Sequence, residues 1–295
     1  MRNQSRCGIT LVELLVVLAI LALMATVAVT STDVFLSQGR YEATTRTLTD
    51  IQEAVLGPPN ARQADGTLVS MGFVADIGRS PQFTALDSTG GIVPVAPSIG
   101  GPSELLLPQS IAPFALIQSA NDTDVVAPCG WRGPYLRLAP GQTSILDGWA
   151  SALYLLNAAG SPAGLGNSIL VVSCSGAGSS TSSPYNAPLA VNIAPSQITV
   201  SGNVYLLDSN GNSANPSSAG AVQVWMYGPN PSNGGLQEVQ CTLTTGTDGV
   251  VSYSIPAGVY APGFLRAYLG SRAAGTQRSA IVRFQRSDVV NLSIP

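Results

Sequence analysis

The feature that most constrains this chain is an apolar segment near its N-terminus, from Ile9 to Thr32, in which Glu13 is the only charged residue. A helix of this length crosses a bilayer core of about 30 Å. The apolar segment follows a short basic leader that ends in Gly8, whereas a secretory signal peptide carries its small-residue cleavage site after the apolar run. Burying an unpaired Glu in lipid costs about 2.5–3.5 kcal/mol, so the segment calls for a partner cation.

The combination of Gly8, a hydrophobic Ile9 and Glu13 resembles the N-terminus of the type IV prepilin family, which includes the pseudopilins of type II secretion. The resemblance implies that prepilin peptidase cuts between Gly8 and Ile9, and that the new N-terminus at Ile9 is N-methylated. It also implies that Glu13 pairs with the terminal amine of a neighbouring subunit during assembly. The alternative is a plain single-pass anchor with an incidental Glu, which would more naturally lie at the flank of the run.

Charges on the two sides of the apolar segment predict its orientation. Arg2 and Arg6 precede the segment, and Asp33 is the first charge after it. The excess of positive charge before the helix favours a cytoplasmic N-terminus. We therefore expect a single-pass protein of the inner membrane with its head domains in the periplasm, or outside the cell after filament assembly.

The helix is expected to continue beyond the membrane to Leu56, where Gly57 and two prolines end it. A narrow stripe of side chains recurs along its second half: Val34, Tyr41, Leu48 and Val55 every seven residues, with Thr44 and Ile51 on adjoining positions. The stripe predicts docking against the chain's own head domain. Lateral contact with other subunits is the alternative.

Composition argues against catalysis and against nucleic-acid binding. The chain has no His, all thirteen of its basic residues are Arg, and only 10% of its residues are charged. General acid–base chemistry near neutral pH, Schiff-base chemistry and imidazole metal ligation therefore lack their usual side chains. The Arg residues form no basic stripe of the kind that a nucleic-acid groove needs. We expect no enzyme activity, no cofactor and no bound metal.

Three cysteines remain once the leader with Cys7 is removed: Cys129, Cys174 and Cys241. An odd number leaves at least one thiol outside any intramolecular pair, and three pairings are open. The Cys129–Cys174 disulfide is favoured because both residues lie in one predicted domain. Buried thiols are the alternative, and no CxxC motif or basic neighbour indicates redox catalysis.

The region from Asn60 to Pro188 is punctuated by Gly and Pro, with few periodic runs. Its clusters Gly130–Tyr135, Asp147–Leu156 and Asn167–Ser173 are similar to the head domain of major pseudopilins, with a Gly-Trp-x-Gly-Pro-Tyr segment followed by an Asp-x-Trp strand and a final strand. Members of that class bind calcium through carboxylates in the loop after the last strand. The corresponding stretch here, residues 174–183, has no carboxylate, which argues against a calcium site; Asp122, Asp124 and Asp147 lie elsewhere.

A Ser/Gly/Pro-rich stretch from Gly176 to Pro195 reads as a linker, after which the pattern becomes alternating. Seven short strands are predicted, at 198–207, 221–227, 239–244, 250–255, 263–269, 279–284 and 289–294, and they favour an antiparallel β-sandwich. Val200–Val204, Thr247–Gly249 and Ile255–Tyr260 resemble the carboxypeptidase regulatory-like or Cna-B-type sandwich. The absence of Lys excludes the Lys–Asn cross-link of some such domains.

The sequence thus predicts an α+β protein in which a long N-terminal transmembrane and pilin helix packs on a small antiparallel-sheet head, followed by an all-β sandwich. The predicted divisions are a leader at 1–8, the helix at 9–57, the head at 58–188 and an independently folding sandwich at 189–295. The expected function is a structural subunit of a type IV pilus-like or type II secretion pseudopilus filament. Its expected partners are other subunits, prepilin peptidase, the secretion assembly platform and the inner membrane. The alternative is a minor tip pilin whose sandwich acts as an adhesin or ligand-binding module, which exposed aromatics near Trp225, Tyr227 and Tyr268 would support.

Overall fold

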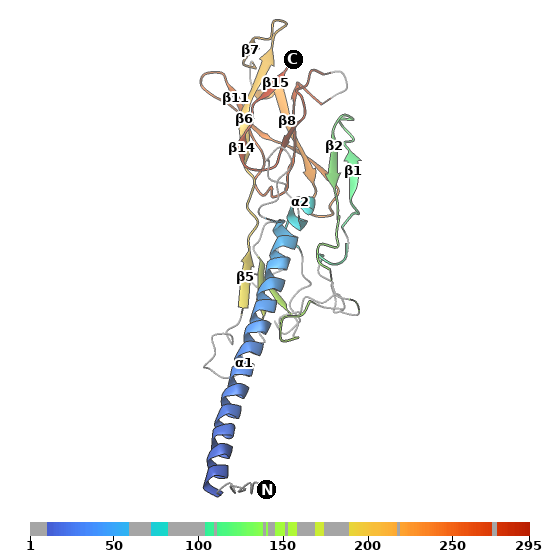
Figure 1. Cartoon of the computed structure of the whole chain (residues 1–295). Helices are drawn as coiled ribbons and strands as arrows, with labels where there is room; N and C mark the ends of the chain where they lie inside the picture. Colours follow the sequence, from blue (N-terminus) through green and yellow to red (C-terminus); the bar gives the residue numbers. More distant parts are fainter. Residues whose placement is uncertain are drawn as a thin grey trace, which may run out of the picture.

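The computed structural model is an elongated molecule in which a long helix carries β-rich lobes at one end (Figure 1). The structure describes residues 11–58, 72–81, 104–108, 111–137, 140, 145–150, 153–157, 169–173, 189–216, 219–272 and 276–295. The predicted α+β class, with a long apolar helix followed by antiparallel sheets, is confirmed.

Helix α1 runs from Leu11 to Leu56, 46 residues, or about 69 Å at a rise of 1.5 Å per residue. It ends where the sequence predicts, because Gly57 takes a left-handed conformation with φ 85° and its N–H bonds the Glu53 carbonyl at 2.7 Å. This is the usual glycine stop for a helix, and the following Pro58 lacks the N–H that another turn would need.

The head is built around the upper half of α1. It comprises a short helix, a two-stranded hairpin and a three-stranded sheet: α2 (Phe73–Ile77), β1 (Ala115–Gln118), β2 (Val126–Cys129), β3 (Tyr154–Asn157), β4 (Ile169–Ser173) and β5 (Leu189–Ile193). The sheet has the order β3-β4-β5 and is antiparallel throughout. Its strand β5 lies against α1 (Figure 1).

The strand β5 differs from the predicted division, which placed residues 189–193 in the sandwich domain. In the structure β5 pairs with β4, and Ile193 is fully buried in the head core. Alternation alone does not tell which sheet a strand joins, since the pattern is the same on either side of a linker. The first strand of the sandwich is β6, which begins at Val200 and lies within the strand predicted at 198–207.

The second lobe consists of two sheets. Its elements are β6 (Val200–Leu207), β7 (Ser213–Ala214), the 3-10 turn η3 (Ala219–Ala221), β8 (Val222–Pro229), β9 (Leu236–Gln240), β10 (Thr242–Thr245), β11 (Val251–Ser254), β12 (Gly263–Leu269), β13 (Val282–Phe284), β14 (Asp288–Val289) and β15 (Leu292–Ile294). One sheet has the order β10-β11-β6-β14, with β7 and β15 also paired to β6, and the other has the order β13-β12-β8-β9.

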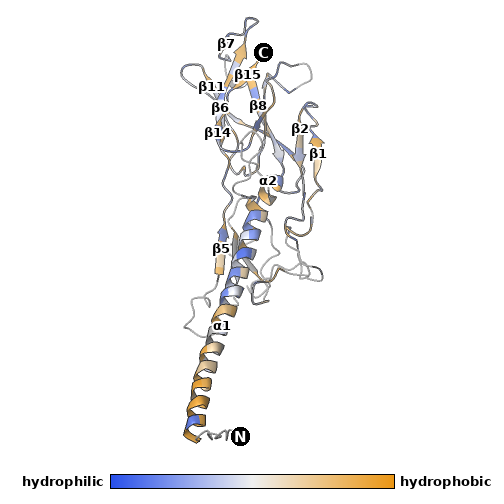
Figure 2. Ribbon diagram, in the orientation of Figure 1, coloured by the Kyte–Doolittle hydropathy of each residue, from blue (hydrophilic) through white to orange (hydrophobic). Residues whose placement is uncertain are grey.

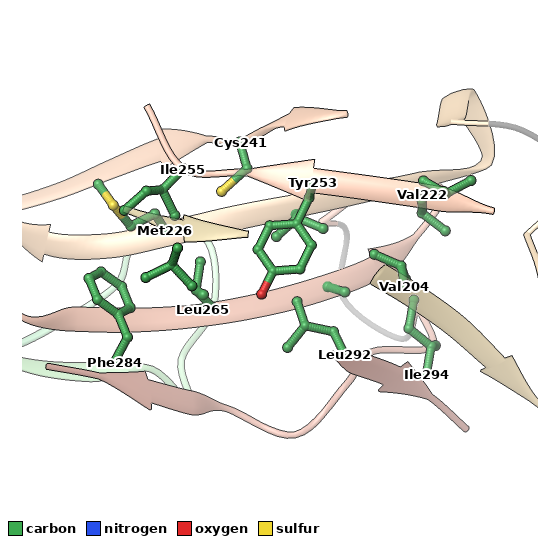
Figure 3. Packing of buried hydrophobic residues seen from close by; sticks show 14 of the residues in the cluster. Val204, Val222, Met226, Cys241, Tyr253, Ile255, Leu265, Phe284, Leu292 and Ile294 are labelled. Atoms are coloured by element: carbon green, nitrogen blue, oxygen red, sulfur yellow. The ribbon is translucent and has the colours of Figure 1, made fainter. Parts of the chain in front are cut away.

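The core of this lobe lies between the two sheets, as the predicted alternation requires. Met226 on β8 and Leu265 on β12 face Tyr253, Ile255 and Leu292 from the opposite sheet (Figure 3). Along β6, β11 and β15 the more buried side chains alternate with more exposed ones, because successive side chains of a strand point to opposite faces.

Two of the predicted strands are divided in the structure. The strand expected at 239–244 changes sheets at Cys241, so that β9 pairs with β8 and β10 pairs with β11. Strands that switch sheets in this way form the corners of sandwiches. The strand expected at 289–294 is divided into β14 and β15, and both pair with β6 in parallel, which departs from the predicted all-antiparallel arrangement. The chain crosses from β13 to the other sheet before β14, and it enters that sheet running in the direction of β6.

Candidate assembly helix and its anchorage in the head

The lower part of α1 is exposed on every side. All residues from Leu11 to Ala28 are solvent-exposed, and this part of the helix is almost entirely apolar (Figure 2). Glu13 lies in its first turn. By length and composition the helix could cross a membrane. A helix that is apolar all round needs apolar surroundings, from lipid or from other helices.

The exposure continues beyond the predicted membrane segment. Val34, Phe35 and Leu36 expose 52%, 71% and 54% of their surface. Val34 is the first member of the predicted stripe, and the structure does not place it against the head. The docking interpretation is therefore correct only for the later part of the stripe. For Val34, contact with other subunits stays the hypothesis.

The later members of the stripe are buried in the head. Leu48, Ile51 and Val55 are 6%, 1% and 1% exposed and belong to one cluster with Phe73 and Ile77 of α2. That cluster also includes Leu105, Leu153, Ile169 and Ile193. Burying a large aliphatic side chain stabilises a fold by about 1.5–3 kcal/mol. Hence the upper half of α1 is an integral core helix of the head.

The head approaches the backbone of α1 closely at Gly148. The Gly148 N–H donates to Thr44 Oγ at 2.9 Å, and Thr44 Oγ donates in turn to the Arg40 carbonyl at 2.9 Å. A Cβ at position 148 would lie 2.0 Å from the Arg40 carbonyl oxygen, so only glycine fits. Thr44, fully buried, therefore serves as a docking residue rather than as part of an apolar seam.

The loop that carries Gly148 is shaped by Asp147. Its Oδ1 accepts the Trp149 N–H at 2.9 Å, and its Oδ2 accepts the hydroxyl of Ser173, at the end of β4, at 2.7 Å. Asp147 is 6% exposed, which suits a carboxylate whose oxygens are hydrogen-bonded. The Asp-x-Trp motif thus holds a loop against the helix.

The Gly-Trp-x-Gly-Pro-Tyr segment closes the other side of the head. Trp131 Nε1 donates to the Glu104 carbonyl at 2.6 Å, and the Tyr135 hydroxyl donates to Asp76 of α2 at 2.8 Å. Burial raises the pKa of Asp76, although the Tyr135 hydrogen bond and nearby Arg132 oppose that shift. Both aromatic side chains thus fix a loop onto α2 and its neighbours.

A buried ion pair, which sequence reasoning missed, lies beside this loop. Arg79 binds both carboxylate oxygens of Glu104 at 2.5 and 2.7 Å, and both side chains are about 4% exposed or less. Arg79 Nε also donates to the Pro231 carbonyl of the second lobe at 2.6 Å. The residues lie 25 positions apart, with no local sequence signal to pair them.

The predicted processing site and disulfide are only partly within the described residues. Gly8, Ile9 and Cys174 lie outside them. Cys129 and Cys241 are both buried, and burial raises the pKa of each thiol to about 12. With Cys174 outside the described residues, the Cys129–Cys174 pairing stays a prediction.

The aromatic residues considered for ligand binding are largely covered. Tyr227 and Tyr268 are 0% and 1% exposed, and the Arg272 guanidinium lies 3.5 Å from the centre of the Trp225 ring. These residues therefore do not form the exposed aromatic surface that the adhesin hypothesis needs.

The comparison with protein families agrees with the N-terminal assignment. Residues 3–29 match the family model of the prokaryotic N-terminal methylation motif. No curated protein and no solved structure matches the chain significantly. The match covers the leader and the first part of the apolar segment, and it supports a type IV pilin-like N-terminus.

Proposed function

We propose that this chain is a structural subunit of a type IV pilus-like or type II secretion pseudopilus filament. It is inserted in the inner membrane with a cytoplasmic N-terminus and periplasmic lobes, cut between Gly8 and Ile9, and N-methylated at Ile9. An assembly platform then moves it from the membrane into the filament.

The observation that carries the proposal is the contrast between the two halves of α1. The half from Leu11 to Ala28 is exposed on all sides, while Thr44 to Val55 is held by the head. Such a helix is presented as a rigid projecting rod, which lipid surrounds before assembly and helices of other subunits surround afterwards. The exposed apolar residues Val34 to Leu36 extend this contact surface beyond the bilayer.

Glu13 has a specific role in this proposal. Its carboxylate neutralises the Ile9 amine of the adjacent subunit when the helix enters the apolar filament interior. A buried charge is costly alone and far less so in a hydrogen-bonded pair. The pairing therefore favours assembly of correctly processed subunits.

The test is the Glu13→Ala variant, with Asp33→Asn, the next acidic residue along α1, as the matched control. We expect both variants to be inserted and to begin at Ile9 in N-terminal sequencing. Sheared-filament yield and subunit crosslinking should be lost in Glu13→Ala and kept in Asp33→Asn.

Two results would contradict the proposal. A chain that still begins at Met1 in cells with a working prepilin peptidase would remove the processing step. Wild-type filament yield from Glu13→Ala would favour the plain membrane anchor instead.

A further inference from the structure

The β1–β2 hairpin lies in the chain between α2 and β3 of the head, yet it covers the outer face of the second lobe. Along β8 and β12, Val224, Met226 and Leu265 face the sandwich core, so alternation places Tyr227, Arg266 and Tyr268 on the opposite, outer face. Those three are nevertheless 0%, 7% and 1% exposed. The hairpin buries them, with β2 lying beside β8 (Figure 1).

Asp122, in the turn of the hairpin, is the centre of this contact. Its side chain is fully buried, and it accepts hydrogen bonds from Nη1 of Arg266 at 2.8 Å and from Nη1 of Arg278 at 3.0 Å. It also accepts a hydrogen bond from the hydroxyl of Tyr268, and the Tyr268 and Tyr227 hydroxyls are hydrogen-bonded to each other at 2.6 Å. A carboxylate from the head thus satisfies two cations and a phenol of the sandwich, more than 140 positions away in the sequence.

A second polar contact lies next to the first. Glu238 of β9 accepts hydrogen bonds from two hairpin residues, the Ser119 hydroxyl at 2.5 Å and the Asn121 side-chain amide at 2.7 Å. It also accepts a hydrogen bond from Arg272 of its own lobe at 2.6 Å. Arg272 also stacks on the Trp225 ring. The two contacts hold both sides of the hairpin turn.

Contacts at the base of the hairpin complete the attachment. The Ala112 N–H bonds the Asn233 carbonyl at 2.8 Å, and a Cβ at Gly234 would lie 2.5 Å from the Ile111 side chain. The head and the sandwich are therefore joined along the whole length of the hairpin as well as by the chain between β5 and β6.

We propose that the hairpin is an intramolecular clamp that makes the head and the sandwich one cooperative unit, with Asp122 as the residue that closes it. A two-stranded hairpin is marginally stable alone, so it depends on the sandwich face. That face in turn depends on the hairpin, because removing Asp122 leaves buried Arg266 without its main counter-charge. The outer face of the β13-β12-β8-β9 sheet is thus occupied by the chain itself and is not offered to an external ligand.

This proposal revises the expectation that residues 189–295 fold independently, and it does not rest on filament assembly. Its test is hydrogen exchange followed by mass spectrometry on the full chain in detergent micelles. In the wild type, the slowest-exchanging amides of β2, β8 and β12 should all exchange through the same opening reaction, with the same opening free energy. Asp122→Asn should speed exchange in these three strands by roughly a hundredfold or more, because it breaks a buried pair.

Asp124→Asn is the matched control, because Asp124 contacts the same two arginines but its side chain is 48% exposed. It should change exchange by less than roughly tenfold. Should Asp122→Asn fail to fold, Arg278→Gln, which removes a partly exposed partner, is expected to give a smaller increase confined to the hairpin and the sheet beneath it. The clamp proposal would be wrong if β2 and β8 of the wild type exchanged through separate opening reactions. It would also be wrong if Asp122→Asn and Asp124→Asn changed the exchange rates equally.

Discussion

Gly148→Ala tests how the head holds the assembly helix. The added Cβ would lie 2.0 Å from the Arg40 carbonyl oxygen and 2.7 Å from its carbon, both in the backbone of α1. Neither atom can rotate away, so the loop must withdraw from the helix. Overpacking of this kind costs about 1–3 kcal/mol, and losing the Gly148 N–H to Thr44 bond adds about 0.5–1.5 kcal/mol. We expect the free energy of unfolding to fall by about 1.5–4.5 kcal/mol.

The same helix supplies a control of opposite sign. Gly39 lies within α1, and a Cβ added there would meet nothing within 4 Å, so Gly39→Ala should stabilise the protein by about 0.5–1 kcal/mol through helix propensity. Denaturant unfolding of the full chain in detergent, followed by circular dichroism, measures both. A Gly148→Ala protein within about 0.5 kcal/mol of the wild type, alongside a stabilised Gly39→Ala, would refute the close approach.

Two further predictions follow from titratable groups. Burial alone would raise the pKa of Asp122, but the Tyr268 hydrogen bond, the Asp124 N–H and the cations Arg266 and Arg278 together lower it. Because the pKa of Asp122 is lower in the folded than in the unfolded protein, the ionised carboxylate stabilises the fold fully above the unfolded pKa of about 3.9. This stabilisation is lost as the pH falls through the folded-state pKa. Urea unfolding between pH 7 and 3 should therefore show a steeper acid loss for wild type than for Asp122→Asn, and parallel profiles would contradict this assignment. The buried thiols Cys129 and Cys241, with pKa values raised to about 12, should resist maleimide in the native protein and react on unfolding, as peptide mass spectrometry without reductant can show. Protection of Cys129 that persists in denaturant would contradict a buried thiol and indicate the Cys129–Cys174 disulfide.

Local patterns were sufficient for the elements whose determinants are local. The apolar run and Gly57 predicted α1 to its last residue. Alternation and turn glycines located the strands of the second lobe, because each strand buries every second side chain whatever its partner. The stripe predicted burial of Leu48, Ile51 and Val55, since residues seven apart lie on one helix face.

The same patterns were insufficient where pairing partners had to be chosen. Nothing in the alternation of 189–193 distinguishes the head sheet from the sandwich, and nothing at Cys241 marks a change of sheet. The stripe position of Thr44 does not indicate its hydrogen-bonding role, which depends on Gly148, 104 positions away. The composition break at 176–195 predicts a boundary between two units, but it gives no sign of the ion pair between Asp122 and Arg266.

The sequence by itself determined that this chain has an N-terminal methylation motif, a long apolar helix and a β-rich remainder, because leader charge, hydropathy and periodicity are local properties. Only the tertiary structure decided how far the head holds that helix and that the hairpin of one lobe covers the other. Those outcomes depend on close backbone approach and on buried charges that meet across more than a hundred residues. The energy of such contacts is set by burial, which no local pattern records.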